Sequence, residues 1–424
     1  MSGRRSFLRL FSSSIVAQAA LSGANLLVGL ILLRHQSAEQ YGYYVLVMAT
    51  VLLLTGLQNA YIGPPLVIRL HQSDPSTRGT LVGGLLREQG RLIGAVAILA
   101  LASVVLAYAS GRLAGPIAGL VLAGIAAAAL AAYREFFRTM LVVYQRPGDV
   151  LPCDLVFVGL LIGGAWLARY APWPAAATVL SLALAAAVGG SLLARALWRH
   201  EPWQHAGTRS VLREFAPIGL WSLLGSGIHW AFTQGYTYLV AALLDLPTVA
   251  AIAATRLLLM PVNLLSQGIV QVMNPAASRW LHLHGAARVY RRLLLLCAGL
   301  FVMIAGYIAV MWLLRDWIFA TILKKSFADR DALLLLWSAI FLLTTLRDQL
   351  ASLLTVRGKL RQMTTLTIVC ATLSLVASYL AIGQFGAVGA LAGILLGESI
   401  SIAGVWVLTH RESLVPGAAA VAGS

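Results

Sequence analysis

Charged side chains are scarce in this 424-residue chain, at 11% of the residues, whereas a soluble protein carries about 25%. Hydrophobic residues make up 59%, and the mean hydropathy is +0.84. So few polar groups do not cover a soluble fold of this length, and apolar runs of about 20 residues, enough to cross a bilayer as helix, recur along the chain. The composition therefore argues against a soluble helical protein and predicts an all-α, polytopic membrane protein.

Cysteine is rare as well, and Cys153, Cys297 and Cys370 stand far apart. Their isolation excludes a disulfide framework and the spacings of a metal site. The sequence also lacks a phosphate-binding glycine loop between a strand and a helix, and we expect no extramembrane domain between the spans. A pump driven by its own ATPase is thereby excluded, and neither a metal nor a resident cofactor is expected.

Twelve segments have the length and composition of a membrane-spanning helix. In chain order they are residues 12–33, 41–63, 92–110, 113–133, 154–170, 174–195, 216–244, 249–273, 291–314, 332–356, 363–383 and 386–409.

Lysine and arginine are distributed unevenly between the two sets of connections. With the N-terminus inside, 23 of the 31 fall in inner segments and 7 in outer ones, while Arg256 lies within a span. Because positive charge resists translocation, this asymmetry predicts an even number of spans with both termini in the cytoplasm. It also explains most of the formal net charge of +16. We therefore expect attraction to anionic membrane lipid and no binding of nucleic acid.

Two short stretches, six spans apart, resemble each other. "YREFFRTMLVVYQRP" (133–147) and "LRDQLASLLTVRGKL" (346–360) each carry an Arg–acid pair and a further arginine ten to twelve residues on. The echo predicts two six-helix bundles, residues 1–205 and 206–424, related by an axis along the membrane normal. Parallel repeats of this kind occur in secondary transporters, with the substrate site between the halves.

One arginine lies deep in an apolar span, within "VAAIAATRLLLMPVNLLSQGI" (249–269). By helix rise, Arg256 is roughly 10 Å from the outer end of that span. A guanidinium there costs about 2.5–3.5 kcal/mol on insertion scales. Pro261 cannot donate to the Leu257 carbonyl, which predicts a bend next to the charge. We interpret Arg256 as lining a water-filled lumen and binding an anion; pairing with an acid for packing is the alternative.

Two Arg–acid pairs are further candidates. Arg134–Glu135 and Arg347–Asp348 lie before the inner ends of their helices. They line an inward-facing vestibule, or they are ordinary interface charges if the helices end earlier.

Glu398 is the deepest acid of the sequence. It is either a counter-ion for Arg256, a protonation site, or a neutral packing residue. Amides within spans bond between helices or bind a polar head group, and the secondary lumen candidates are Asn25, Gln58, Gln234 and Gln267.

Four stretches resemble a known family: "LSGANLLVGLILLRHQSAEQYGYYVLVMA", "REFFRTMLVVYQRPGDVLPCDL", "AAIAATRLLLMPVNLLSQGIVQVMNPAASRW" and "FGAVGALAG". They are similar to bacterial polysaccharide and O-antigen flippases (Wzx-type) of the multidrug/oligosaccharidyl-lipid/polysaccharide (MOP, MATE-like) exporter superfamily. The resemblance implies a transporter without enzymatic activity, in the bacterial inner membrane. It also implies two helix bundles that open alternately to each side around a cationic lumen.

The resemblance further implies an undecaprenyl-pyrophosphate-linked oligosaccharide as cargo, for O-antigen or exopolysaccharide synthesis. The expected anion site comprises Arg256, Arg347 and Arg134. The expected coupling or counter-ion groups, for a proton or sodium gradient, are Glu398, Asp348 and Glu135. A polysaccharide polymerase and a chain-length regulator are the expected protein partners.

Two other functions remain open. A cation-coupled multidrug antiporter should line its cavity with acids, and here only Glu398 is deep and on its own. A membrane polysaccharide polymerase or ligase should carry a large outer loop with basic catalytic residues, and the longest expected outer loop, residues 315–331, is short.

Overall fold

A computed structural model describes residues 2–72, 74–204 and 210–414, and every regular element in this part of the chain is helical. Contacts between the helices divide the chain into two compact units, Met1–Gly227 and Ile228–Ser424. Helix α7 (Val211–Leu243) contributes its first part to the first unit and the rest to the second. The predicted boundary between residues 205 and 206 lies outside the described residues.

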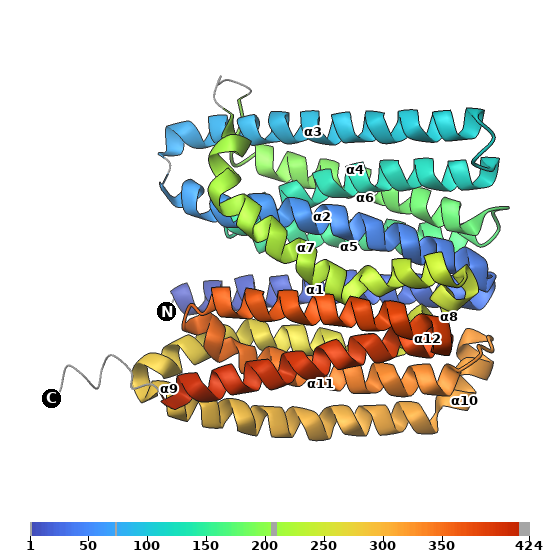
Figure 1. The fold of residues 1–424 in the computed structure, drawn as a ribbon. Coiled ribbons are helices and arrows are strands. Elements are labelled where there is room, and N and C mark those ends of the chain that lie inside the picture. Colours follow the sequence, from blue (N-terminus) through green and yellow to red (C-terminus); the bar gives the residue numbers. More distant parts are fainter. Residues whose placement is uncertain (1, 73, 205–209, 415–424) are drawn as a thin grey trace. The chain divides into compact units, whose positions relative to one another are not determined.

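The first unit is built around α4 (Figure 1). Its helices are α1 (Ser2–His35), α2 (Ala38–Gln72), α3 (Pro75–Ala109), α4 (Gly115–Val143), α5 (Pro147–Ala168) and α6 (Pro174–Trp198). Helix α4 packs on α2, α3, α5 and α6, whereas α3 packs mainly on α4. Prolines begin α3, α5 and α6, where a missing backbone N–H leaves no hydrogen bond unmade.

The second unit is built around α11. Besides the end of α7, it contains α8 (Leu246–Leu258), α9 (Met260–Leu313), α10 (Arg315–Trp317), a π-helical turn η1 (Ile318–Leu323), α11 (Arg330–Val356) and α12 (Leu360–Leu414). Helix α11 packs on α8, α9 and α12 (Figure 1). It therefore contacts every long helix that follows α7 in the chain.

Helix α12 is a hairpin of two antiparallel arms. The chain turns at Gly386, whose φ of 55° and ψ of −130° suit a residue without Cβ. On the two sides of this turn Gly393 lies against Ser378, and the Ser378 hydroxyl donates to the Ala390 carbonyl at 2.9 Å. The two arms correspond to the predicted spans 363–383 and 386–409.

Helix α9 reverses direction in the same way at Gly285, where φ is 75°. Its arms are joined where the Arg292 guanidinium lies over the Trp280 ring, 4.7 Å from its centroid. The first arm continues the span that α8 begins, and the second arm corresponds to the predicted span 291–314.

These reversals bring the number of candidate spans close to the predicted twelve. In the described chain nine helices are long and apolar enough to cross a membrane, or ten if the bent pair of α8 and the start of α9 is one span. This count treats α12 as a single span, so the second arm of α12 is an eleventh. Helix α7, with 33 residues, is long enough to cross a membrane but is not among these apolar candidates. The prediction of an all-α, multi-pass membrane protein is confirmed.

The α12 hairpin makes a prediction about stability. Gly393→Ala should lower the melting temperature of the purified protein in detergent, because the new Cβ would overlap the Ser378 backbone, and overpacking costs about 1–3 kcal/mol. Gly383→Ala is the matched control, since a Cβ at Gly383 meets no atom within 4 Å. Equal melting temperatures for the two variants would contradict the close packing of the arms.

Candidate functional site

The helical span that carries Arg256 is broken. The axes of α8 and of the first arm of α9 meet at 53°. Pro261 lies in the first turn of α9, and the Val262 N–H bonds to the Leu259 carbonyl at 3.0 Å. This releases the Leu258 carbonyl, which accepts the Tyr307 hydroxyl at 2.7 Å. The predicted bend is therefore present, beginning two residues before Pro261.

Arg256 is half-buried in the last turn of α8, about 15 Å along the helix from its first residue. Its Nη1 donates to Gln234 Oε1 at 3.0 Å and to the Tyr236 hydroxyl at 3.3 Å. The guanidinium carbon lies 5.3 Å from the centroid of the Trp337 ring. The ring and the C-terminal end of α8 both stabilise a positive charge.

The partners of Arg256 are all neutral. The ion pairs between described residues join other basic side chains to carboxylates, and none of them includes Arg256. Its Nε is buried without a hydrogen-bond partner among the described residues. The positive charge of Arg256 is therefore solvated by dipoles, and no carboxylate of the described chain neutralises it.

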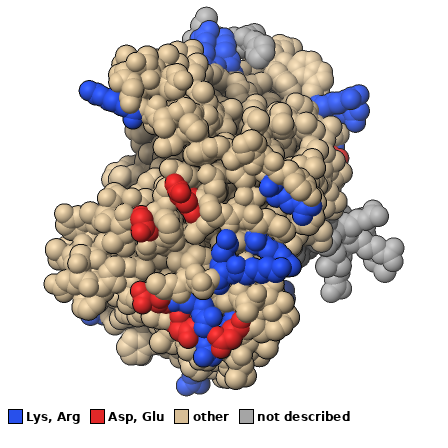
Figure 2. Space-filling model, turned by 90° about the vertical axis from the view of Figure 1, so that its right-hand side faces the viewer, with Lys and Arg blue, Asp and Glu red and all other residues tan. Residues whose placement is uncertain are grey.

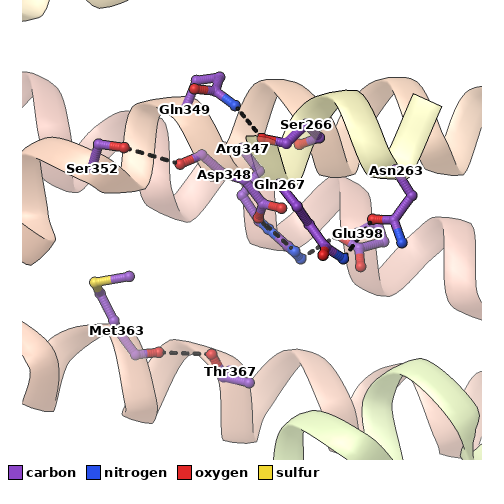
Figure 3. A network of polar contacts seen from close by, with 10 residues as sticks. All are labelled: Asn263, Ser266, Gln267, Arg347, Asp348, Gln349, Ser352, Met363, Thr367 and Glu398. Carbon is purple, nitrogen blue, oxygen red and sulfur yellow. Dashed lines mark hydrogen bonds and ion pairs between the residues drawn. The ribbon is translucent and has the colours of Figure 1, made fainter. Parts of the chain in front are cut away.

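A second arginine of this unit lies between two acids (Figure 3). Arg347, on α11, contacts Glu398 Oε2 on α12 through Nη1 at 2.5 Å. Its Nη2 and Nε reach Asp348 Oδ1 at 2.9 and 3.1 Å. The Glu398 side chain is almost fully buried, whereas the Asp348 side chain is 36% exposed. Glu398 is thus the counter-ion of Arg347 and not of Arg256.

Asp348 also faces a pocket of about 360 Å³ between α9 and α11. Gln267, Asn274, Ser352 and Thr355 contribute polar side chains to its lining. The Asn274 Oδ1 is buried and has no partner among the described residues, while Gln267 bonds weakly to Asn263 at 3.4 Å. Asp348 thus presents a carboxylate to this pocket, with Arg347 on one side and neutral oxygen-bearing groups beside it, and such a carboxylate can receive a cation or a proton.

The first unit contains a buried charge cluster of its own, on α4 and α5. Arg134 contacts Asp154 Oδ1 through Nη2, and the Arg138 Nε reaches the other Asp154 oxygen at 3.0 Å. Arg138 also lies 3.7 Å from Glu135. The Phe157 ring covers the Arg134 guanidinium at 3.9 Å. With two cations and two anions this cluster is neutral, and Asp154 at its centre is fully buried.

Asp154 is the residue that sequence reasoning missed. The predicted span begins at residue 154, which put this acid at the membrane boundary. Helix α5 in fact begins at Pro147, so that Asp154 lies two turns inside it. Pro147 directly after the loop residue Arg146 is a helix-start signal and would have placed the acid correctly.

The predicted amides lie in different places. Gln234 is brought to Arg256, and Gln267 to the pocket beside Asp348. In the first unit Gln58 donates to the Ala132 carbonyl at 2.8 Å, and Asn25 is exposed on α1.

Where α10 lies in the second unit, basic and acidic side chains stand next to each other (Figure 2). At this end of the second unit Arg330 pairs with Asp316 and Asp331 at 2.5 and 2.9 Å, and Arg315 with Asp331 at 3.3 Å. Two of the seven basic residues predicted to be outer are thus balanced by acids. The assignment of the basic end to the cytoplasm stays a prediction.

Comparison with known proteins gives the fold. No protein-family model matches the chain, and no curated protein matches it significantly. Among solved structures it is similar to an inward-facing multidrug resistance MATE family transporter of the MOP superfamily, with a TM-score of 0.76, 15% identity, and 93% of this chain and 94% of that chain covered. An outward-facing structure of such a transporter has a TM-score of 0.67 and 14% identity, with 96% of this chain and 95% of that chain covered.

A MOP superfamily transporter from Pyrococcus furiosus has the same TM-score of 0.67 and 14% identity, with 96% of this chain and 95% of that chain covered. The reversed polarity of its binding pocket is described as suggesting a different function. The chain therefore has the MATE-type transporter fold.

The buried cluster of the first unit can be tested by stability. Asp154→Asn should strongly reduce the yield of folded protein, because it leaves two arginines without their shared carboxylate, and breaking a buried pair costs about 3–5 kcal/mol. Asp149→Asn, at an exposed pair with Arg146 on the same helix, should cost no more than about 1 kcal/mol. Size-exclusion profiles and melting temperatures of both variants would measure this, and similar values for the two would refute it.

Proposed function

We propose that this protein is a flippase that translocates an undecaprenyl-pyrophosphate-linked oligosaccharide by alternating access. The observation that carries the proposal is the state of Arg256: a cation about half a bilayer deep, held by an amide, a phenol and an indole ring, with no carboxylate partner among the described residues. A charge left without a counter-ion at this depth is available to an anion.

Pyrophosphate suits this position chemically. Arginine offers a planar fork of donors that binds phosphate oxygens in pairs and stays protonated at any physiological pH. Among the described residues, only the Arg256 Nη1 has protein acceptors at hydrogen-bond distance. The lipid tail of such a cargo would remain in the bilayer, while the sugar and the pyrophosphate would cross along the passage that Arg256 lines.

Arg134 and Arg347 have a different part in this proposal. Each is already bound by carboxylates, Arg134 by Asp154 and Arg347 by Glu398 and Asp348. We therefore assign the anion to Arg256 first. The two other arginines would receive a phosphate only if their acids were protonated or bound to another cation.

Glu398 and Asp348 are the proposed coupling groups, for a proton or a sodium ion. Both acids pair with Arg347. Binding of a proton or a sodium ion to either acid would therefore weaken its ion pair with the guanidinium. Helix α11 connects this group to the anion site, since Trp337 lies beside Arg256 and Arg347 follows ten residues later, about 15 Å along the helix. One helix thus contacts Arg256 through Trp337 and carries Arg347 and Asp348.

The bacterial inner membrane with both termini in the cytoplasm is the proposed location. A polysaccharide polymerase and a chain-length regulator are the proposed partners, since they would consume the translocated units.

A cation-coupled multidrug antiporter is the second candidate. The 36% exposed side chain of Asp348, in a polar pocket of about 360 Å³, favours it, because an organic cation could pair with this carboxylate. The neighbouring structures described as multidrug resistance transporters agree with this function as well as with a flippase.

The two functions are separated by one variant series in proteoliposomes. A pyrophosphate-linked polyprenyl sugar carrying a fluorophore, quenched from outside, reports flipping; a fluorescent organic cation reports antiport. Arg256→Gln should reduce flipping of the first probe at least tenfold, because it removes a charged hydrogen bond of about 1.5–3 kcal/mol. Arg256→Lys should retain part of it, since the charge stays but the fork is lost.

Arg292→Gln is the matched control, because Arg292 lies in the same unit but stacks on Trp280. Flipping by Arg256→Gln at the level of this control would refute the anion site. Transport of the cation alone, lost in Asp348→Asn, would establish the antiporter.

A further inference from the structure

The first unit contains a slot that the proposed transport function does not use. It lies between α2, α3, α4 and the beginning of α7 and has a volume of about 400 Å³. Its walls are apolar, with side chains such as Leu57, Ile93, Ala97, Ala128 and Ala129. None of the described residues that line it carries a charge.

One end of this slot contains unpaired amides. Gln89 is 3% exposed, yet neither its Oε1 nor its Nε2 has a hydrogen-bond partner in the described part of the protein. Gln58 uses its Nε2 on the Ala132 carbonyl, and its Oε1 is likewise buried and unpaired. Tyr61 completes this end and donates to the Leu212 carbonyl. A buried amide without partners is costly and indicates that another molecule supplies them.

The slot has the length of one bilayer leaflet. Gln89 lies among Arg87, Glu88 and Arg91, the charges that mark where the apolar part of α3 begins. The far end of the slot is at Ala100, eleven residues later, or about 16 Å by helix rise. Half of a hydrocarbon core of about 30 Å is nearly the same distance. The amides are therefore at a membrane boundary, and the apolar end is near the midplane.

The slot is also accessible from the bilayer. Leu92 and Val96 line it and are 58% and 51% exposed. Its occupant must be uncharged along its length, as long as one leaflet, and able to hydrogen-bond at the boundary end. An ester-linked acyl chain has these properties, since its carbonyl lies where the hydrocarbon begins. An isoprenoid chain has no carbonyl for the amides.

We propose that this slot binds a glycerophospholipid of the adjoining leaflet, with one acyl chain along α3 and its ester carbonyl accepting a hydrogen bond from the Gln89 amide. The proposal is independent of the cargo and of Arg256. It assigns a lipid-binding role to α3, the helix that packs mainly on α4.

Photolabelling tests the position of the chain. The full-length protein is placed in nanodiscs with a phosphatidylcholine that carries a diazirine midway along one acyl chain, and labelled peptides are identified by mass spectrometry. Ala97→Trp fills the slot and should remove most of the label from the facing helix, at residues 125–132 of α4. Ile98→Trp is the matched control, because Ile98 is 67% exposed and does not line the slot. Equal labelling of these residues in both variants would overturn the proposal.

A comparison of ester and ether lipids tests the carbonyl. Wild-type protein should capture the ester-linked probe roughly fivefold more than an ether-linked probe of equal chain length, as expected for one hydrogen bond. Gln89→Leu should remove this preference and, because it deletes an unpaired buried amide, should not lower the melting temperature. Equal capture of the ester-linked and ether-linked probes by the wild type would refute the assigned contact and would mean that water alone fills this end of the slot.

Discussion

Lipid offers a buried charge neither a counter-ion nor a hydrogen bond. Each unit of this protein therefore has to supply partners for its own buried charges. In the first unit Asp154 receives two arginines and is fully buried. In the second, Arg347 is held between two carboxylates. The same requirement governs the backbone, because the carbonyl released at the α8–α9 break is taken by Tyr307. Arg256 departs from this pattern, because its partners among the described residues are all neutral.

The second unit combines an unneutralised cation with an acid pair on one framework. Helix α11 supplies the Trp337 ring to Arg256 and carries both Arg347 and Asp348. Since the helix is continuous between these residues, a change of charge at one place is felt at the other through a rigid element as well as through space. An anion and a coupling cation would therefore act on the same helix.

The sequence was sufficient for the fold and for the bend beside Arg256. Hydropathy and charge asymmetry placed twelve spans, and Pro261 predicted the break beside Arg256. The ion-pair partners of the charged residues could not be predicted from the sequence, because they depend on which helices pack together. Glu398 belongs to Arg347 since α11 packs on α12. Asp154 was lost because a hydropathy window ends a helix at its first charge, even where that charge is paired inside the protein.

The tight reversal at Gly386 bears on how the chain reaches the membrane. Residues on the two arms of α12 that touch each other, such as Ser378 and Ala390, are only twelve positions apart. Contacts this local close small loops and form quickly. The last two spans can thus insert as one preassembled hairpin, in which small residues allow the arms to approach before any other helix is in place. Biogenesis of the C-terminal end then depends on a single glycine whose backbone conformation other residues rarely adopt.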